Sequence, residues 1–144
     1  MALLIDEFEL VTEIDNALNL VIAGTPINNK LKHIYNNQTS TPKFDKRIIY
    51  HLDFIPREKI PVYFMAYNIV ILPYKAIDRL EIIHLAYSFS KPIIATDVGD
   101  FSEIIEHNKS GMILERNTPA ALAEFILESC TTDDLKKMGS MLNV

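Results

Sequence analysis

Short apolar runs alternate along the chain with longer segments in which apolar residues recur every three or four positions. A continuous apolar run ended by Gly or Pro is typical of a strand covered on both faces, whereas the wider spacing is typical of an amphipathic helix. The runs that predict strands are 18–24, 47–54, 68–73, 92–96 and 111–114. The segments that predict helices are 2–16, 27–37, 58–67, 80–89, 100–106 and 120–129. Thr118 and Pro119 should open the last of these, and a further helix is expected between the caps Thr131 and Asp134 and the stop Gly139.

This alternation predicts an α/β fold, a Rossmann-like parallel sheet of about five strands with helices on both faces. Because no internal repeat or interdomain linker is visible, residues 1–144 are expected to form a single domain. In an open sheet of this kind, ligands bind beyond the carboxyl ends of the strands. The segments to search for a binding site are therefore 24–27, 54–57, 73–81 and 96–100.

Composition and charge narrow the classes of function. The formal net charge is -5, from 14 Lys+Arg and 19 Asp+Glu, and no basic cluster is present, which disfavours nucleic-acid binding. The apolar runs are far shorter than the ~20 residues that cross a membrane, and the first residues do not resemble a secretory signal, so a cytoplasmic location is expected. The single cysteine, Cys130, excludes an internal disulfide and argues against a cysteine-bound metal.

Four segments, in order, carry a resemblance to a known family. "LNLVIAG", "DFIPREKIPVYFMAYNIVILPY", "LAYSFSKPIIATDVGDFSEIIEHNKSGMIL" and "TPAALAEFIL" resemble the C-terminal domain of retaining glycosyltransferases of family 4 (group 1). The resemblance covers nearly the whole chain and implies a GT-B fold, in which this half binds a nucleotide-diphosphate sugar and a separate N-terminal domain binds the acceptor. It implies a hexosyltransferase-like enzyme of carbohydrate biosynthesis that needs no metal and no cofactor, and the sequence contains no Asp-x-Asp after a strand.

The same resemblance implies where the donor would bind. The nucleotide base belongs on the loop matched by residues 54–57, and the diphosphate belongs on the loop and helix start matched by residues 77–82. A helix start suits a diphosphate because its free N–H groups and dipole favour negative charge. The expected donor-binding residues are Gly24, Thr25, Ile55, Pro56, Arg57, Ile77, Asp78, Arg79, Leu80, Glu81 and Ile82. No catalytic residue is assigned.

The chain departs from the family pattern at positions that matter for the donor. The two glutamates that many members carry fall on Ile77 and Leu85, and neither side chain can accept a hydrogen bond from a sugar. Asn68, Ser90 and Asp100 stand where the family usually has Asp, Gly and Gly. The chain begins at the family's first helix, so the first strand and the Arg/Lys pair that grips the diphosphate are expected to be missing, although Arg79 could pair with a phosphate. Donor binding is therefore expected to be weak or lost.

Several conspicuous residues have a structural interpretation. Asp100 and Glu103, three positions apart at a helix start, are expected to form a pair like a capping box. Pro73 and Tyr74 are expected to end a strand and pack. The side chains of Tyr63, Phe64 and Tyr67 follow helical spacing and are expected to belong to the core. The histidines His33, His51, His84 and His107 are scattered and are expected to be non-catalytic.

Three functions remain open on the sequence. The chain is either the donor-binding half of a sugar-transferring enzyme, inactive by itself, or a degenerate module that binds a protein partner. A generic small Rossmann-like regulatory domain is the third, although the acidic cluster that such domains need is not supplied. In the fold that the resemblance implies, the first strand is central and lies between the strands matched by 18–24 and 68–73. Its absence predicts either direct pairing of these two strands or a strand supplied by a second copy or partner, and hence a possible homodimer.

Overall fold

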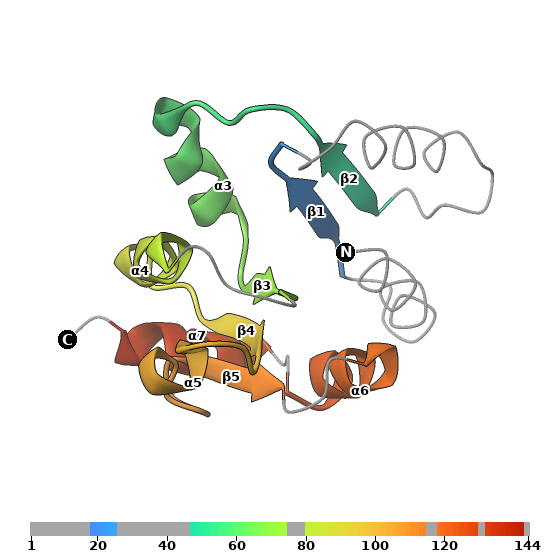
Figure 1. Ribbon diagram of the computed structural model, residues 1–144, viewed down its shortest axis with the longest axis vertical. Helices are drawn as coiled ribbons and strands as arrows, with labels where there is room; N and C mark the ends of the chain where they lie inside the picture. The colour runs from blue at the N-terminus through green and yellow to red at the C-terminus, as the bar shows by residue number, and fades with distance from the viewer. Residues whose placement is uncertain (1–17, 26–46, 75–79, 115–117, 130–131, 143–144) are drawn as a thin grey trace. The chain divides into compact units, whose positions relative to one another are not determined.

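The computed structural model describes residues 18–25, 47–74, 80–114, 118–129 and 132–142 (Figure 1). The chain separates into two compact units, one formed by residues 12–60 and the other by residues 1–11 and 61–144, and each is described by itself. All the strands in the described parts pair in parallel. Whether residues 1–144 act as one domain stays a prediction.

The smaller unit contains a two-stranded parallel sheet. Strand β1 (Leu20–Ala23) pairs with β2 (Ile48–His51), in a register that places Leu20 opposite Ile48 and Ala23 opposite His51. Leu20, Ile22 and Ile48 are buried. After β2 the chain enters a short 3-10 helix, η1 (Arg57–Lys59), which continues directly into α3 (Ile60–Ala66).

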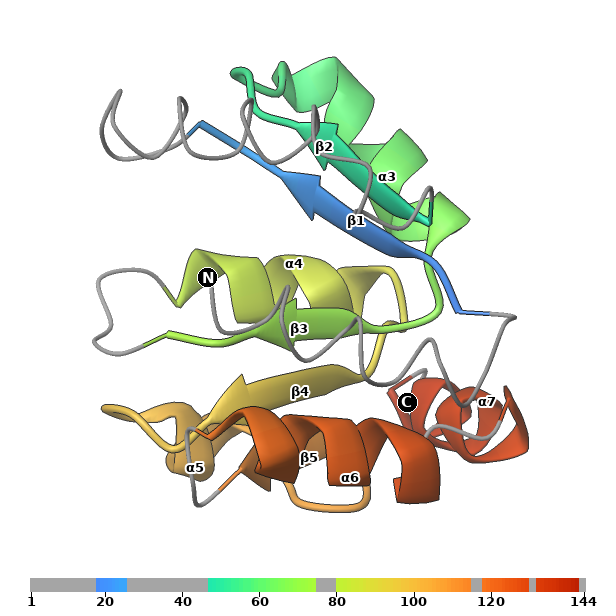
Figure 2. The same cartoon turned by 90° about the vertical axis from the view of Figure 1, so that its right-hand side faces the viewer.

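The larger unit is built on a three-stranded parallel sheet in the order β3-β4-β5, seen side by side in Figure 2. The strands are β3 (Val70–Leu72), β4 (Ile93–Thr96) and β5 (Gly111–Leu114). All four residues of β4 are buried, as expected for a strand with neighbours on both sides. Its helices are α3, apart from its first residue, α4 (Glu81–Ser88), α5 (Phe101–Ile104), α6 (Pro119–Ser129) and α7 (Thr132–Met141).

The core of this unit lies between the sheet and helices α4 and α5. Its buried members are apolar side chains from β3, β4, α4, α5 and the residue after α5: Leu72, Ile83, Ala86, Ile93, Ala95, Phe101 and Ile105. Phe101 is fully buried, and Ile83 and Ala86 turn the apolar face of α4 toward the strands. The apolar residues whose spacing predicted α4 therefore form the face of the helix that packs on the sheet.

The parallel α/β architecture and the five strands of the described residues confirm the predicted fold class. The first three strands are shorter than predicted by three or four residues, the fourth by one, and the fifth has the predicted bounds. The described strands fall into two sheets, β1-β2 in one unit and β3-β4-β5 in the other. The expected pairing of strand 18–24 with strand 68–73 would join the two units and stays a prediction.

The helix ends confirm one of the predicted caps and stops and differ from two others. Ala121 N–H donates to Thr118 Oγ1 over 3.4 Å, and Pro119 is the first helical residue, as predicted. Gly139 does not stop the last helix, which runs on to Met141; a Cβ at this position would lie 2.7 Å from the Ser90 carbonyl oxygen, so the glycine permits a close approach. Asp100 precedes α5, but its side chain makes no capping hydrogen bond. The predicted helices 2–16 and 27–37 and the cap at Thr131 fall in parts that are not described.

Helix α4 ends in a Schellman motif. Ser90 N–H donates to Tyr87 O at 2.8 Å, and Lys91 N–H donates to Ala86 O at 3.0 Å. Ser90 has φ 53, the left-handed conformation that glycine adopts freely. The backbone at Ser90 therefore suits the glycine that the resemblance leads one to expect at this position.

The aromatic residues of α3 pack to different degrees. Phe64 packs against the core cluster and stacks on Phe89, with ring centroids 5.4 Å apart. Tyr63 and Tyr67 are only half-buried and contact each other at 6.3 Å. Burial raises the pKa of Tyr67, with a smaller contribution from Tyr63.

No helix in the described parts of the chain is long and apolar enough to cross a membrane.

Candidate functional site: loops at the carboxyl ends of the strands

In the smaller unit, two expected site segments leave the sheet at the same edge. Because β1 and β2 are parallel and Ala23 pairs with His51, the loops that follow them emerge side by side. Gly24 has φ 126 and open space around the position of a Cβ, while Thr25 is exposed. Gly24 N–H is bonded to His51 O at 3.0 Å, so this turn is fixed to β2 and presents Thr25 to solvent.

The loop after β2 carries an exposed aromatic ring and a cation. Leu52 is buried and anchors the loop, whereas the Phe54 side chain is 79% exposed. Ile55 and Pro56 are half-buried, and Arg57 is the exposed first residue of η1. The arrangement offers a planar apolar surface and a guanidinium on one short loop, which suits an aromatic ring joined to an anion.

In the larger unit, the start of α4 lies at the carboxyl-end edge of β3. Leu80 is the residue before the helix, and Ile83 N–H donates to Leu80 O at 3.0 Å. Leu80 and Ile82 pack against the core cluster, so of the three expected site residues only Glu81 is exposed. Leu80 and Ile82 can therefore serve a ligand through backbone groups alone. Ile77, Asp78 and Arg79 are among the residues that the structure does not describe.

A buried threonine joins the ends of β3 and β4. Thr96 is 2% exposed, and its Oγ1 donates to the Tyr74 carbonyl oxygen at 2.6 Å. The Tyr74 ring also lies against Phe101, with centroids 6.2 Å apart. Tyr74 thus follows the end of β3 and contacts Phe101, while its side chain remains 41% exposed, so the predicted packing is partial. The sequence analysis did not single out Thr96, whose only signal is a hydroxyl at the end of an apolar strand.

The exposed charged side chains at the carboxyl ends of the strands of the larger unit are acidic. Glu81, Asp97 and Asp100 are exposed, and Leu85, one turn after Glu81, is half-buried. The described lysines of this unit lie elsewhere: Lys91 precedes β4, Lys109 precedes β5, and Lys136 and Lys137 belong to α7. The carboxylates repel a diphosphate, so any anion here depends on backbone N–H groups and on segment 75–79.

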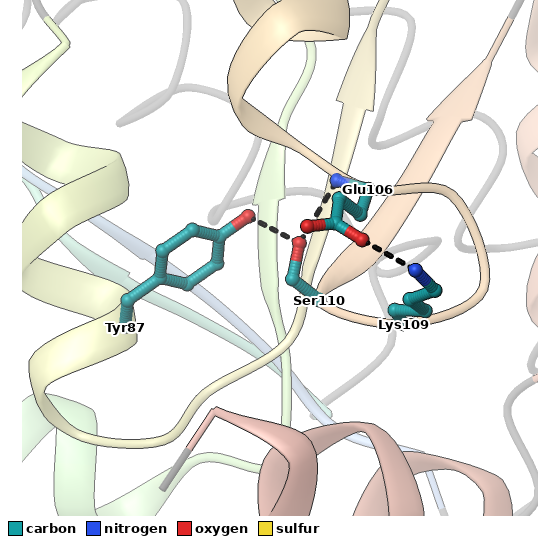
Figure 3. Close-up of polar contacts among 4 residues, drawn as sticks. All are labelled: Tyr87, Glu106, Lys109 and Ser110. Atoms are coloured by element: carbon teal, nitrogen blue, oxygen red, sulfur yellow. Dashed lines mark hydrogen bonds and ion pairs between the residues drawn. The ribbon is translucent and has the colours of Figure 1, made fainter. Parts of the chain in front are cut away.

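A second polar cluster lies at the opposite, amino-end edge of the sheet (Figure 3). The Tyr87 hydroxyl and Ser110 Oγ are 2.8 Å apart, Glu106 N–H donates to Ser110 Oγ at 3.0 Å, and Lys109 Nζ donates to Glu106 Oε2 at 2.7 Å. Burial raises the pKa of Tyr87, the hydrogen bond with Ser110 lowers it, and the Glu106 charge raises it again. These contacts hold the turn before β5 in place.

The described edges present groups that can contact a ligand. They offer backbone groups, an exposed ring, Arg57 and a helix start. Within the described ranges, no group of three or more His, Cys, Asp or Glu side chains could hold a metal ion. His51 and His84 are exposed, and the His107 ring accepts a hydrogen bond from Ile113 N–H at 3.4 Å. Their non-catalytic role stays a prediction.

The known proteins to which this chain is similar are glycosyltransferases. The family model of glycosyl transferases group 1 matches residues 1–131. An uncharacterized glycosyltransferase of Methanocaldococcus jannaschii is 44% identical over 48 residues, which is 33% of this chain and 14% of that protein. The chain therefore belongs to the group 1 glycosyl transferases.

Solved structures show the same fold at low sequence identity. The C-terminal domain of LpcC, a group 1 family glycosyl transferase of Francisella tularensis, has a TM-score of 0.77 and 19% identity over 97% of this chain and 73% of that one. Anabaena HepE, solved with UDP and glucose, has a TM-score of 0.74 and 19% identity over 99% of this chain and 38% of that one. These matches confirm the predicted resemblance to a GT-B glycosyltransferase domain. The chain spans well under half the length of HepE and of the archaeal relative.

Proposed function

We propose that the chain is the donor-binding half of a retaining glycosyltransferase, which transfers a sugar from a nucleotide-diphosphate sugar to an acceptor bound by a separate domain. The observation that carries the proposal is membership of group 1 over residues 1–131, joined to a fold shared with HepE, whose crystals hold UDP and glucose or UDP-glucose. The cytoplasmic location and the role in carbohydrate biosynthesis expected from the sequence stay predictions.

In this proposal the described residues recognise different parts of the donor. Phe54, Ile55 and Pro56 supply the surface for the base, and Arg57 supplies a positive charge next to it. The turn at Gly24 and Thr25 in the smaller unit and the backbone of residues 80–82 in the larger unit are each proposed to contact the donor. Preorganised N–H groups would stabilise the charge that develops on the diphosphate as the glycosidic bond breaks, without a metal.

Affinity is expected to be weak, in the high micromolar range or poorer. Leu85 offers no hydrogen bond where many relatives have a glutamate, and the exposed carboxylates of Glu81, Asp97 and Asp100 oppose a diphosphate. The chain alone is also expected to transfer no sugar, because catalysis requires the acceptor to be held against the donor. Transfer that depends on this chain alone would contradict that expectation.

Titration of UDP, GDP and ADP and their glucose esters, followed by amide chemical shifts, tests the site. Shifts are expected to concentrate at residues 24–25, 54–57 and 80–82. Arg57→Ala and Arg79→Ala should each weaken binding about tenfold or more, because each removes a charge-assisted hydrogen bond. Lys136→Ala removes an exposed cation from α7 and is the matched control, expected to leave binding unchanged. Tight binding that survives both arginine variants would refute the placement of the site.

A second function is a degenerate module that binds a protein partner and no donor. The observation that favours it is the exposed acidic side chains of Glu81, Asp97 and Asp100, which repel a diphosphate. The same titration separates the two functions. If millimolar nucleotide sugars leave every amide shift and the melting temperature unchanged, the module is the better description.

A further inference from the structure

Tyr74 is an exposed aromatic residue at the edge of the larger unit's sheet where ligands bind in folds of this kind. Leu72 of β3 pairs with Ala95 of β4, which places Tyr74 just beyond the carboxyl ends of both strands (Figure 2). Its side chain is 41% exposed. The other exposed large apolar residues that the structure describes in this unit lie on helices: Val62 and Met65 on α3, and Met141 at the end of α7.

Both the backbone and the ring of Tyr74 are held by buried residues. The Tyr74 carbonyl oxygen accepts a hydrogen bond from Thr96 Oγ1 at 2.6 Å, and Thr96 is 2% exposed. The Tyr74 ring lies against Phe101, which is fully buried, with ring centroids 6.2 Å apart and an interplanar angle of 53°. Because the residue is fixed in this way, it has little conformational freedom to lose when a ligand packs on the exposed part of the ring.

The charges beside the ring indicate which part of a nucleotide sugar it can contact. Asp97 directly follows Thr96, Asp100 directly precedes Phe101, and both aspartates are exposed. A carboxylate repels a phosphate but accepts hydrogen bonds from hydroxyl groups. The face of a pyranose ring presents C–H groups, which pack well on the negative face of an aromatic ring. An exposed ring with carboxylates near it therefore suits an uncharged sugar better than a diphosphate.

We propose that the Tyr74 ring contacts the sugar of the nucleotide-sugar donor and is a specificity-determining residue of the donor site. This inference rests on the proposed function and names the part of the donor that binds at this edge. One face of the sugar packs on the ring, and sugar hydroxyls donate to the carboxylates of Asp97 and Asp100. The diphosphate is left to the backbone N–H groups at the start of α4. Thr96 is a positioning residue, because it acts through the Tyr74 carbonyl.

Titration of the whole chain with a nucleoside diphosphate and with its glucose ester tests this contact, using whichever of UDP, GDP and ADP binds most tightly. Tyr74→Ala should weaken binding of the glucose ester by about threefold to tenfold, as expected for the loss of one aromatic contact, and should change binding of the diphosphate by less than about twofold. Tyr74→Phe keeps the ring and should bind both ligands within about twofold of the parent chain. Nuclear Overhauser effects between the Tyr74 ring and the glucose C–H protons are expected in the unmodified chain, so this measurement does not depend on the folding of a variant.

The matched control is Tyr63→Ala, which removes a half-buried ring from α3 and should leave both affinities within about twofold of the parent. A chain that binds none of the three diphosphates or their glucose esters overturns the proposed function and this inference together. Three results overturn this inference alone: an ester affinity unchanged in folded Tyr74→Ala, an equal loss of affinity for the diphosphate and the ester, or bound glucose without a nuclear Overhauser effect to the Tyr74 ring.

Discussion

Thr96 donates its hydroxyl to the Tyr74 carbonyl oxygen over 2.6 Å, and this contact joins the carboxyl ends of β3 and β4 where segment 73–81 begins. Thr96 is nearly inaccessible, at 2% exposed, so water cannot replace the hydrogen bond. Thr96→Val keeps the shape and removes the donor. The expected loss is about 1–2 kcal/mol of unfolding free energy.

Urea unfolding measures that loss, and Thr96→Ser is the matched control because it keeps the hydroxyl. If Thr96→Val proved as stable as the parent chain, the hydrogen bond would not hold the two strand ends together.

Gly111 admits no side chain. A Cβ at this position would lie 2.2 Å from the Ile93 carbonyl oxygen and 3.0 Å from Ile105 Cγ2. Gly111→Ala should therefore force β4 and β5 apart and lower the unfolding free energy by about 3 kcal/mol or more. Thermal unfolding followed by circular dichroism would measure the change.

Gly24→Ala is an instructive comparison for Gly111→Ala. Nothing lies within 4 Å of a Cβ at Gly24, so its cost comes from the backbone alone, at φ 126. A loss of about 1–3 kcal/mol is expected. A larger loss for Gly24→Ala than for Gly111→Ala would show that the close contact with Ile93 is not the dominant constraint.

Replacing Ser90 with glycine is expected to stabilise the fold. At φ 53 the serine occupies a left-handed conformation that costs about 1–2 kcal/mol, while glycine gives back about 0.5–1 kcal/mol in the unfolded chain. Ser90→Gly should therefore raise the unfolding free energy by about 0.5 kcal/mol, measured by urea unfolding. Ser90→Ala keeps the strain and is expected to bring no gain, so a stabilising alanine would argue against this conformational cause.

The Glu106–Lys109 ion pair makes a prediction about pH. The hydrogen bond from Lys109, and then its charge, hold the pKa of Glu106 below its ordinary value. The pair therefore favours the fold above the pKa of a glutamate in the unfolded chain, and this contribution disappears as pH falls through the lower pKa of the folded state. Both side chains are exposed, so the effect on stability is expected to be small.

Carboxyl chemical shifts recorded against pH would give the midpoint directly. Glu106 should titrate at lower pH in the parent chain than in the Lys109→Ala variant. Equal midpoints in the two proteins would mean that the ion pair is not formed in solution.

The sequence by itself determined the order and type of the described elements. Apolar runs such as 93–96 have the length and composition of buried strands, and the spacing in α4 gives one packing face, because both patterns follow from local geometry and burial. The four-segment resemblance was enough to predict the family, which the match over residues 1–131 confirms.

Other features were decided only by the tertiary structure, because they depend on contacts between segments that are distant in the sequence. Gly139 looked like a helix stop, but its position against the Ser90 carbonyl shows that the missing side chain makes room for a neighbouring turn. Thr96 gained its role only when folding placed Tyr74, 22 residues away, within hydrogen-bond distance. The pairing of β4 with both β3 and β5 likewise joins segments that are distant in sequence, and a residue pattern along one strand does not specify its partners.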